Sequence, residues 1–153
     1  MKHLNFRVRR AESSDLEQLI SFTAHEFREA EGNAEAPDTI SHGVRTALED
    51  DSLGMYWVLV KDDSQVIGNV SVIKEWSDWL AGYYWWIQSM YIQPNYRGIG
   101  LMEKLLDAVK AAARDEAVLK LRLYVHKMNA RAITAYRKSG FFDADYQIMR
   151  MKL

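Results

Sequence analysis

The 153-residue sequence contains no cysteine, only two prolines and only eight glycines. Without cysteine the chain has no disulfide, no thiolate ligand for a metal and no cysteine nucleophile. This composition fits a reducing compartment. Because proline and glycine are so scarce, no linker rich in these residues divides the chain. We therefore expect one domain over residues 1–153.

The sequence also lacks an excess of charge of either sign. It has 20 Lys plus Arg and 21 Asp plus Glu, for a formal net charge of −1. Proteins that bind nucleic acids need positive charge to neutralise phosphates, so we expect no nucleic-acid partner. No segment approaches the roughly 20 apolar residues of a membrane helix, and no apolar core follows the basic N-terminus as in a signal peptide. We expect no membrane association and a cytoplasmic location.

Helix and strand patterns alternate along the chain, and 48% of the residues are hydrophobic. Ser14 and Glu17 form a capping-box pattern before a first helix, and Pro37 suits the start of a second. Helices are predicted over 14–30, 37–48, 98–114 and 129–138. Strands are predicted over 6–9, 55–61, 65–74, 83–92, 119–125 and 146–152. The order β-α-α-β-β-β-α-β-α-β indicates a mixed α/β fold with a partly antiparallel central sheet flanked by helices.

A short loop with Arg97, Gly98 and Gly100 connects a predicted strand to a predicted helix. The first turn of a helix has unpaired N–H groups and partial positive charge. Glycines let the backbone approach an anion closely, so the loop predicts a pyrophosphate site. It matches neither the dinucleotide nor the triphosphate loop, since Glu103 stands three residues after Gly100 and no Gly-Lys-Ser/Thr follows. By itself the loop is equally consistent with an ordinary turn bearing a surface arginine.

A second motif lies about thirty residues further along. The pattern N-x-x-A-x-x-x-Y-x-x-x-G-F begins at Asn129 and ends at Phe141. Four of its residues share one helix face: Asn129, Ala132, Ile133 and Tyr136. The order of strand, Arg/Gly loop, helix, alternating strand and this motif resembles the GNAT family of N-acetyltransferases. The specific part of the resemblance covers about residues 83–142. It implies the acyl-CoA N-acyltransferase fold, acetyl-CoA as cosubstrate, and direct acetyl transfer to a primary amine through a tetrahedral intermediate.

The resemblance also implies a set of cofactor-binding residues. The strand that would pair with the pantetheine arm maps onto Met90, Tyr91 and Ile92. The pyrophosphate loop maps onto Arg97, Gly98, Ile99, Gly100, Leu101 and Met102. Met102 departs from the small residue of the family pattern, although the backbone N–H is retained there. Asn129 would contact the pantetheine arm or help to close the site.

The resemblance makes Tyr136 the group that protonates the departing thiolate. A phenol with a pKa near 10 stays protonated at neutral pH, which suits this role. The acceptor amine, with a pKa of about 10.4 in water, must lose a proton before it attacks. Some family members have a glutamate on the strand before the loop, but residues 85–89 contain no carboxylate. The candidates for the general base are Glu75, Asp78 and His126.

The segment Glu75-Trp76-Ser77-Asp78-Trp79 follows the predicted strand on the side where the fold receives its acceptor. Its carboxylates and aromatic rings suit a cationic amine through charge pairing and cation–π contact, so Glu75, Trp76 and Asp78 are candidate substrate-binding residues. A core or a homodimer surface is an equally good interpretation.

No metal site is expected, because the four histidines are scattered. The segment from His25 to Glu29 reads H-E-x-x-E rather than H-E-x-x-H. We expect His25 and Glu26 to lie on a solvated helix face.

Two other functions remain open beside acetyl transfer to a small amine. One is a CoA-binding sensor or partner protein without catalysis, favoured by the missing strand carboxylate and opposed by Tyr136 and Asn129. The other is acetylation of a protein N-terminus or a lysine side chain, for which the sequence shows neither a recognition signature nor a contrary feature. Release of CoA in the presence of amines separates an enzyme from a sensor.

Overall fold

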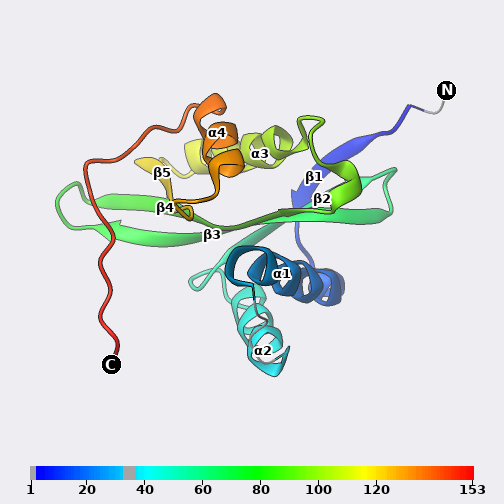
Figure 1. The fold of residues 1–153 in the computed structure, drawn as a ribbon, viewed down its shortest axis with the longest axis horizontal. Helices are drawn as coiled ribbons and strands as arrows, with labels where there is room; N and C mark the ends of the chain where they lie inside the picture. Colours follow the sequence, from blue (N-terminus) through cyan, green and yellow to red (C-terminus); the bar gives the residue numbers. More distant parts are fainter. Residues whose placement is uncertain (1–2, 33–36) are drawn as a thin grey trace.

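The computed structural model describes residues 3–32 and 37–153, and its central feature is a mixed sheet with helices on both faces (Figure 1). The strands are β1 (Phe6–Arg10), β2 (Met55–Lys61), β3 (Gln65–Ser77), β4 (Gly82–Ile92) and β5 (Lys120–Leu123). The helices are α1 (Leu16–Glu31), α2 (Pro37–Leu48), α3 (Leu101–Asp115) and α4 (Ala130–Lys138), with short 3-10 turns η1 (Ser13–Asp15) and η2 (Pro94–Tyr96). None of these helices is both long and apolar enough to cross a membrane.

The five strands lie in the order β1-β2-β3-β4-β5. The first three pairings are antiparallel, and β4 pairs with β5 in parallel. The predicted α/β class with a partly antiparallel sheet is therefore confirmed. A bulge interrupts the β3–β4 ladder, because Ser71 is opposite Ser89 while Val72 is opposite Ile87.

Two hydrophobic cores lie on opposite faces of the sheet. Side chains of a strand alternate between faces, so Trp57 and Leu59 of β2 enter one core while Tyr56 and Val58 enter the other. α3 packs on the first face, and α1 and α2 cover the second, as Figure 1 shows. With both faces covered, β2 is buried over six of its seven residues.

Helix boundaries follow local backbone chemistry. Gly32 ends α1 with a φ of 82°, as its position after the helical pattern predicted, whereas Asn33 lies outside the described residues. The predicted Ser14–Glu17 capping box is wrong: the chain enters α1 through η1, and the backbone N–H of Glu12 donates to Asp15 (2.7 Å). Asp15 is also held by Arg9 at 2.8 Å and 3.0 Å, which fixes the start of α1 against β1.

Two strand predictions need correction. β3 continues to Ser77 rather than ending at Lys74, so Glu75 and Trp76 lie within the strand. The predicted last strand over residues 146–152 is absent, because residues 141–153 form no helix or strand. A strand needs a neighbour for its backbone groups, and this segment passes the sheet without joining β5 (Figure 1).

Candidate active site

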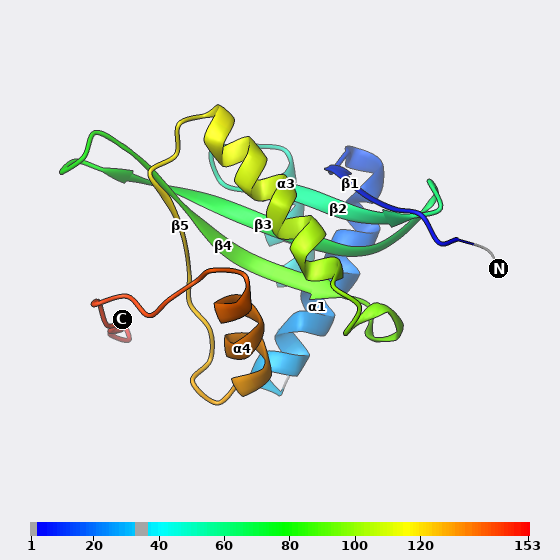
Figure 2. The ribbon, with the colours of Figure 1, turned by 90° about the horizontal axis from the view of Figure 1, so that it is seen from above.

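β4 and β5 separate half-way along β4, and Figure 2 shows them diverging toward α4. They pair only from Tyr84 to Ile87, next to the bulge. The N–H of Gln93 donates to β3, at Ile67 (2.9 Å). Because successive amides point to opposite edges of a strand, the N–H groups of Met90 and Ile92 face the opening. In this structure the N–H of Met90 donates to the side chain of Glu26 (3.3 Å), so an extended ligand that pairs with this edge replaces that contact.

The glycine loop leads from this open strand into α3. Gly98 and Gly100 have φ angles of 80° and 84°, and a Cβ added at either would meet nothing within 4 Å. Gly100 is the N-cap of α3 and offers no side-chain cap, so no side chain of this residue competes for the first N–H groups of the helix. The side chain of Met102 is partly buried and packs against the larger core. The loop therefore keeps space and donors for a pyrophosphate despite the departure at Met102.

Arg97 holds the loop to its neighbours through its side chain. Nε donates to the carbonyl of Ile92 (2.6 Å), and a terminal nitrogen binds Glu29 of α1 (2.9 Å). The guanidinium also lies 5.1 Å from the centre of the Tyr91 ring. The Arg97 side chain therefore positions the loop. The open space beside Gly98 and Gly100 is left to the backbone of the loop.

Tyr136 lies half-buried on α4 and packs edge-to-face on Phe141, with ring centres 5.6 Å apart. Burial, and then the negative charge of Glu26, raise the pKa of Tyr136 to about 12. The phenol therefore holds its proton at neutral pH. Asn129, the first residue of the motif, is the N-cap of α4, and its side-chain oxygen accepts from the N–H of Ala132 (3.1 Å).

Glu26 is half-buried between α1 and the open part of β4, so the expectation that it lies on a solvated face is wrong. The N–H of Met90 donates to its carboxylate at 3.3 Å. Burial is the main cause that raises the pKa of Glu26 to about 7, opposed by the Met90 hydrogen bond and aided by the charge of Glu29. The spacing contains a signal for this position, since Glu26 follows the buried Leu19 and Phe22 by seven and four residues.

A family model described as the acetyltransferase (GNAT) family matches residues 16–141. This chain belongs to the GNAT family. Its members' activity makes the protein an acetyl-CoA-dependent N-acetyltransferase, as the sequence resemblance predicted.

Individual relatives agree with this assignment. The thialysine N-epsilon-acetyltransferase of Caenorhabditis elegans is 26% identical over 132 residues, 86% of this chain and 80% of that protein. The protein of the same name from Bos taurus is 32% identical over 78 residues, and this match spans 51% of this chain but only 45% of the bovine protein.

Solved structures show the same fold. A possible acetyltransferase from Clostridium difficile 630 is 31% identical, covers 97% of both chains and has a TM-score of 0.89. A predicted acetyltransferase from Clostridium acetobutylicum, solved with acetyl-CoA, is 20% identical, covers 96% of both chains and has a TM-score of 0.78. A protein with the same fold as this chain therefore binds acetyl-CoA.

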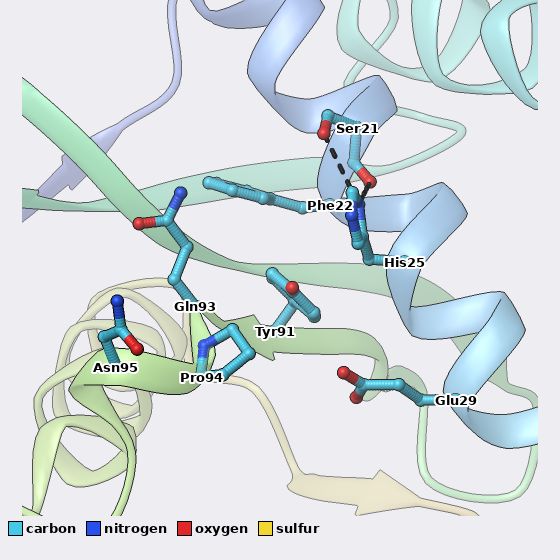
Figure 3. A pocket seen from close by; sticks show the side chains of 8 residues that line it. All are labelled: Ser21, Phe22, His25, Glu29, Tyr91, Gln93, Pro94 and Asn95. Atoms are coloured by element: carbon cyan, nitrogen blue, oxygen red, sulfur yellow. Dashed lines mark hydrogen bonds between the residues drawn. The ribbon is translucent and has the colours of Figure 1, made fainter.

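A pocket of about 430 Å³ opens on the α1 side of this GNAT fold, beside the end of β4 (Figure 3). Phe22 of α1 and Tyr91 of β4 stack in it with ring centres 5.1 Å apart. Exposed His25 binds the carbonyl of Ser21 through Nδ1 (2.7 Å), so it remains on the helix surface as predicted. The complete lining is Ser21, Phe22, His25, Glu29, Tyr91, Gln93, Pro94 and Asn95.

The other predicted base and acceptor residues lie away from the opening. Glu75 is on β3 opposite Tyr84, where β4 still pairs with β5. It accepts from Nε1 of Trp86 (2.5 Å) and lies 3.6 Å from Arg122. The neighbouring Trp76 points to the other face of the sheet, because successive side chains alternate, so these two residues do not share one pocket.

Asp78 and His126 are both exposed. Asp78 belongs to the turn between β3 and β4. His126 follows β5 and accepts from the N–H of Met128 through Nδ1 (3.1 Å). Within the described ranges no three metal-ligating side chains come together. Among Tyr136, Glu75 and His126, only Tyr136 is linked to the open part of β4. The link is Glu26, which accepts from the N–H of Met90 and whose charge acts on Tyr136.

Proposed function

We propose that this enzyme transfers the acetyl group of acetyl-CoA to the primary amine of a small molecule by direct attack, with Tyr136 as the general acid. The observation that supports the proposal is the convergence of three groups at the opening of the sheet. These are the backbone N–H groups of β4, the Glu26 carboxylate and the protonated phenol of Tyr136. The absence of cysteine agrees with direct transfer, and it suits the cytoplasm, where we place the enzyme.

The glycine loop, the open part of β4 and Tyr136 have separate roles in this reaction. The backbone of Gly98, Ile99 and Gly100 and the first turn of α3 bind the pyrophosphate. When acetyl-CoA binds, the carbonyl oxygen of the thioester replaces the Glu26 carboxylate at the N–H of Met90, and the N–H of Ile92 holds the pantetheine arm. Negative charge develops on this carbonyl oxygen, which the N–H stabilises. The amine nitrogen forms a bond to the carbonyl carbon and the carbon–sulfur bond breaks. Tyr136 then donates its proton to the sulfur, which leaves as the CoA thiol.

The acceptor that we propose is a small cationic amine with a lysine-like side chain. This proposal is supported by the thialysine N-epsilon-acetyltransferase of Caenorhabditis elegans, a relative with a named substrate that matches 86% of this chain. A free thiol is released in each turnover, so a screen of amines with acetyl-CoA and a thiol reagent measures the reaction directly. The panel should contain thialysine, lysine, polyamines, aminoglycosides and peptides with a free N-terminus.

We expect thialysine or lysine to give the fastest thiol release, at least tenfold above the rate without amine. Release only with peptides would replace the small-molecule acceptor by a protein. CoA binding by calorimetry without release from any amine would refute the enzymatic proposal and favour a CoA-binding sensor.

A further inference from the structure

The carboxylate of Glu26 faces the open part of β4. It is the group that the N–H of Met90 contacts at the opening (3.3 Å), and this N–H belongs to the open edge that would bind the thioester. Glu26 comes from α1, Met90 from β4 and Tyr136 from α4, so three elements far apart in sequence meet here. A carboxylate beside a reacting carbonyl and opposite a proton donor has the position of a general base.

We infer that Glu26 is the general base that removes a proton from the acceptor ammonium group. The inference rests on the proposed acetyl transfer and names the base that the sequence left open. Glu75 is a poorer candidate, because Trp86 and Arg122 already occupy its carboxylate on the paired part of the sheet. His126 is exposed on the loop after β5.

The groups around Glu26 suit this role. From its own helix Glu29 faces it, and Glu29 is itself paired with Arg97. From β2 and α4, Tyr56 and Tyr136 face it, and the charge of Glu26 contributes to the raised pKa of both phenols. Since the pKa of Glu26 is about 7, the carboxylate is an effective acceptor near neutral pH, whereas an ordinary carboxylate is too weak a base.

The protons balance in this scheme. The ammonium group gives one proton to Glu26 before attack and loses a second when the amide forms. Tyr136 gives one proton to the sulfur and recovers the second proton of the amine, and Glu26 returns its own to water. Protonation of Glu26 also removes the negative charge that raises the pKa of Tyr136, so the phenol becomes a stronger acid at the step that needs it.

The test compares full-length wild type with Glu26→Gln, Glu26→Asp and Glu75→Gln, using acetyl-CoA and thialysine or the fastest amine of the screen. Glu31→Gln, at the exposed end of α1, is the matched control. We expect Glu26→Gln to lower kcat about 10²-fold at pH 7, with the KM for acetyl-CoA within about twofold. Wild-type kcat/KM should rise with an apparent pKa of about 7. The rise of kcat/KM with pH near 7 should be absent in Glu26→Gln. Glu26→Asp should be faster than Glu26→Gln and slower than wild type.

Thermal unfolding of the same variants gives a readout without substrate. A carboxyl pKa raised from 4.5 to about 7 on folding means that wild type loses stability as pH rises through this range. Glu26→Gln cannot undergo this loss. The unfolding temperature of Glu26→Gln relative to that of wild type should therefore increase from pH 5 to pH 8. The midpoint of Glu31→Gln should follow wild type.

Three results would overturn the role of Glu26. The first is a wild-type rate and pH profile in Glu26→Gln. The second is loss of the rise of kcat/KM near pH 7 in Glu75→Gln instead. The third is the absence of thiol release from wild type with any amine, which refutes the proposed function and the base with it. Wild-type turnover together with an unaffected Glu26→Gln refutes only the base.

Discussion

Replacing Tyr136 by phenylalanine should lower kcat by about 10²-fold, the low end of general acid effects. The substitution removes the proton that the thiolate would take and keeps the ring that packs on Phe141. Affinity for CoA should stay within about twofold. Because the pKa of Tyr136 is about 12, its ionisation should not limit wild-type turnover below about pH 10.

The measurement needs conditions in which chemistry limits the rate, so single-turnover thiol release is the suitable assay. Tyr146→Phe, which removes a hydroxyl from an exposed tyrosine, is the control and should keep the wild-type rate. Equal turnover in wild type and Tyr136→Phe would remove this phenol from the mechanism, while the family assignment would stand.

Replacing Gly100 by valine should weaken CoA binding by well over tenfold, at least ~1.4 kcal/mol. Gly100 has a φ of 84°, and its missing Cβ leaves open space at the start of α3. A branched side chain there fills the space that a phosphate needs in order to reach the N–H groups of the helix. Calorimetry with CoA measures this loss directly.

Gly32→Val is the matched control for backbone strain. Gly32 has a φ of 82°, and a Cβ added there also meets nothing within 4 Å. It is the C-cap of α1 and does not belong to the glycine loop. Both variants should lose about 1–2 kcal/mol of stability from the left-handed conformation, and only Gly100→Val should lose CoA affinity. Unchanged affinity in a folded Gly100→Val variant would refute the pyrophosphate site.

Local chemistry explains the elements that were predicted well. Periodicity identified α1, α2 and β2, because the helical and strand repeats differ and each element buries one or both faces. Helix α3 was predicted to begin at Gly98, three residues before its observed start at Leu101. The positive φ angles of Gly98 and Gly100 delay its start, and such angles are permitted by glycine but not dictated by it.

Side-chain placement between distant elements could not be predicted in the same way. Glu75 and Trp76 were read as one cluster because they are adjacent in sequence, but β3 extends through them and sends them to opposite faces. Glu26 was read as solvated because carboxylates usually are. Its position against Met90 depends on how α1 crosses the end of β4, a contact between residues 64 apart in sequence.

The sequence by itself determined the α/β class, the glycine loop, Tyr136 on its helix and membership of the GNAT family, since each depends on residues close together in the chain. Only the tertiary structure decided which carboxylate faces the opening and whether the C-terminal segment finds a partner. Both depend on packing between distant segments. For Glu26, burial converts an ordinary side chain into one with a pKa of about 7. For the C-terminal segment, a strand pattern forms no strand because the segment does not pair with β5, the edge strand of its own sheet, and so makes no ladder hydrogen bonds.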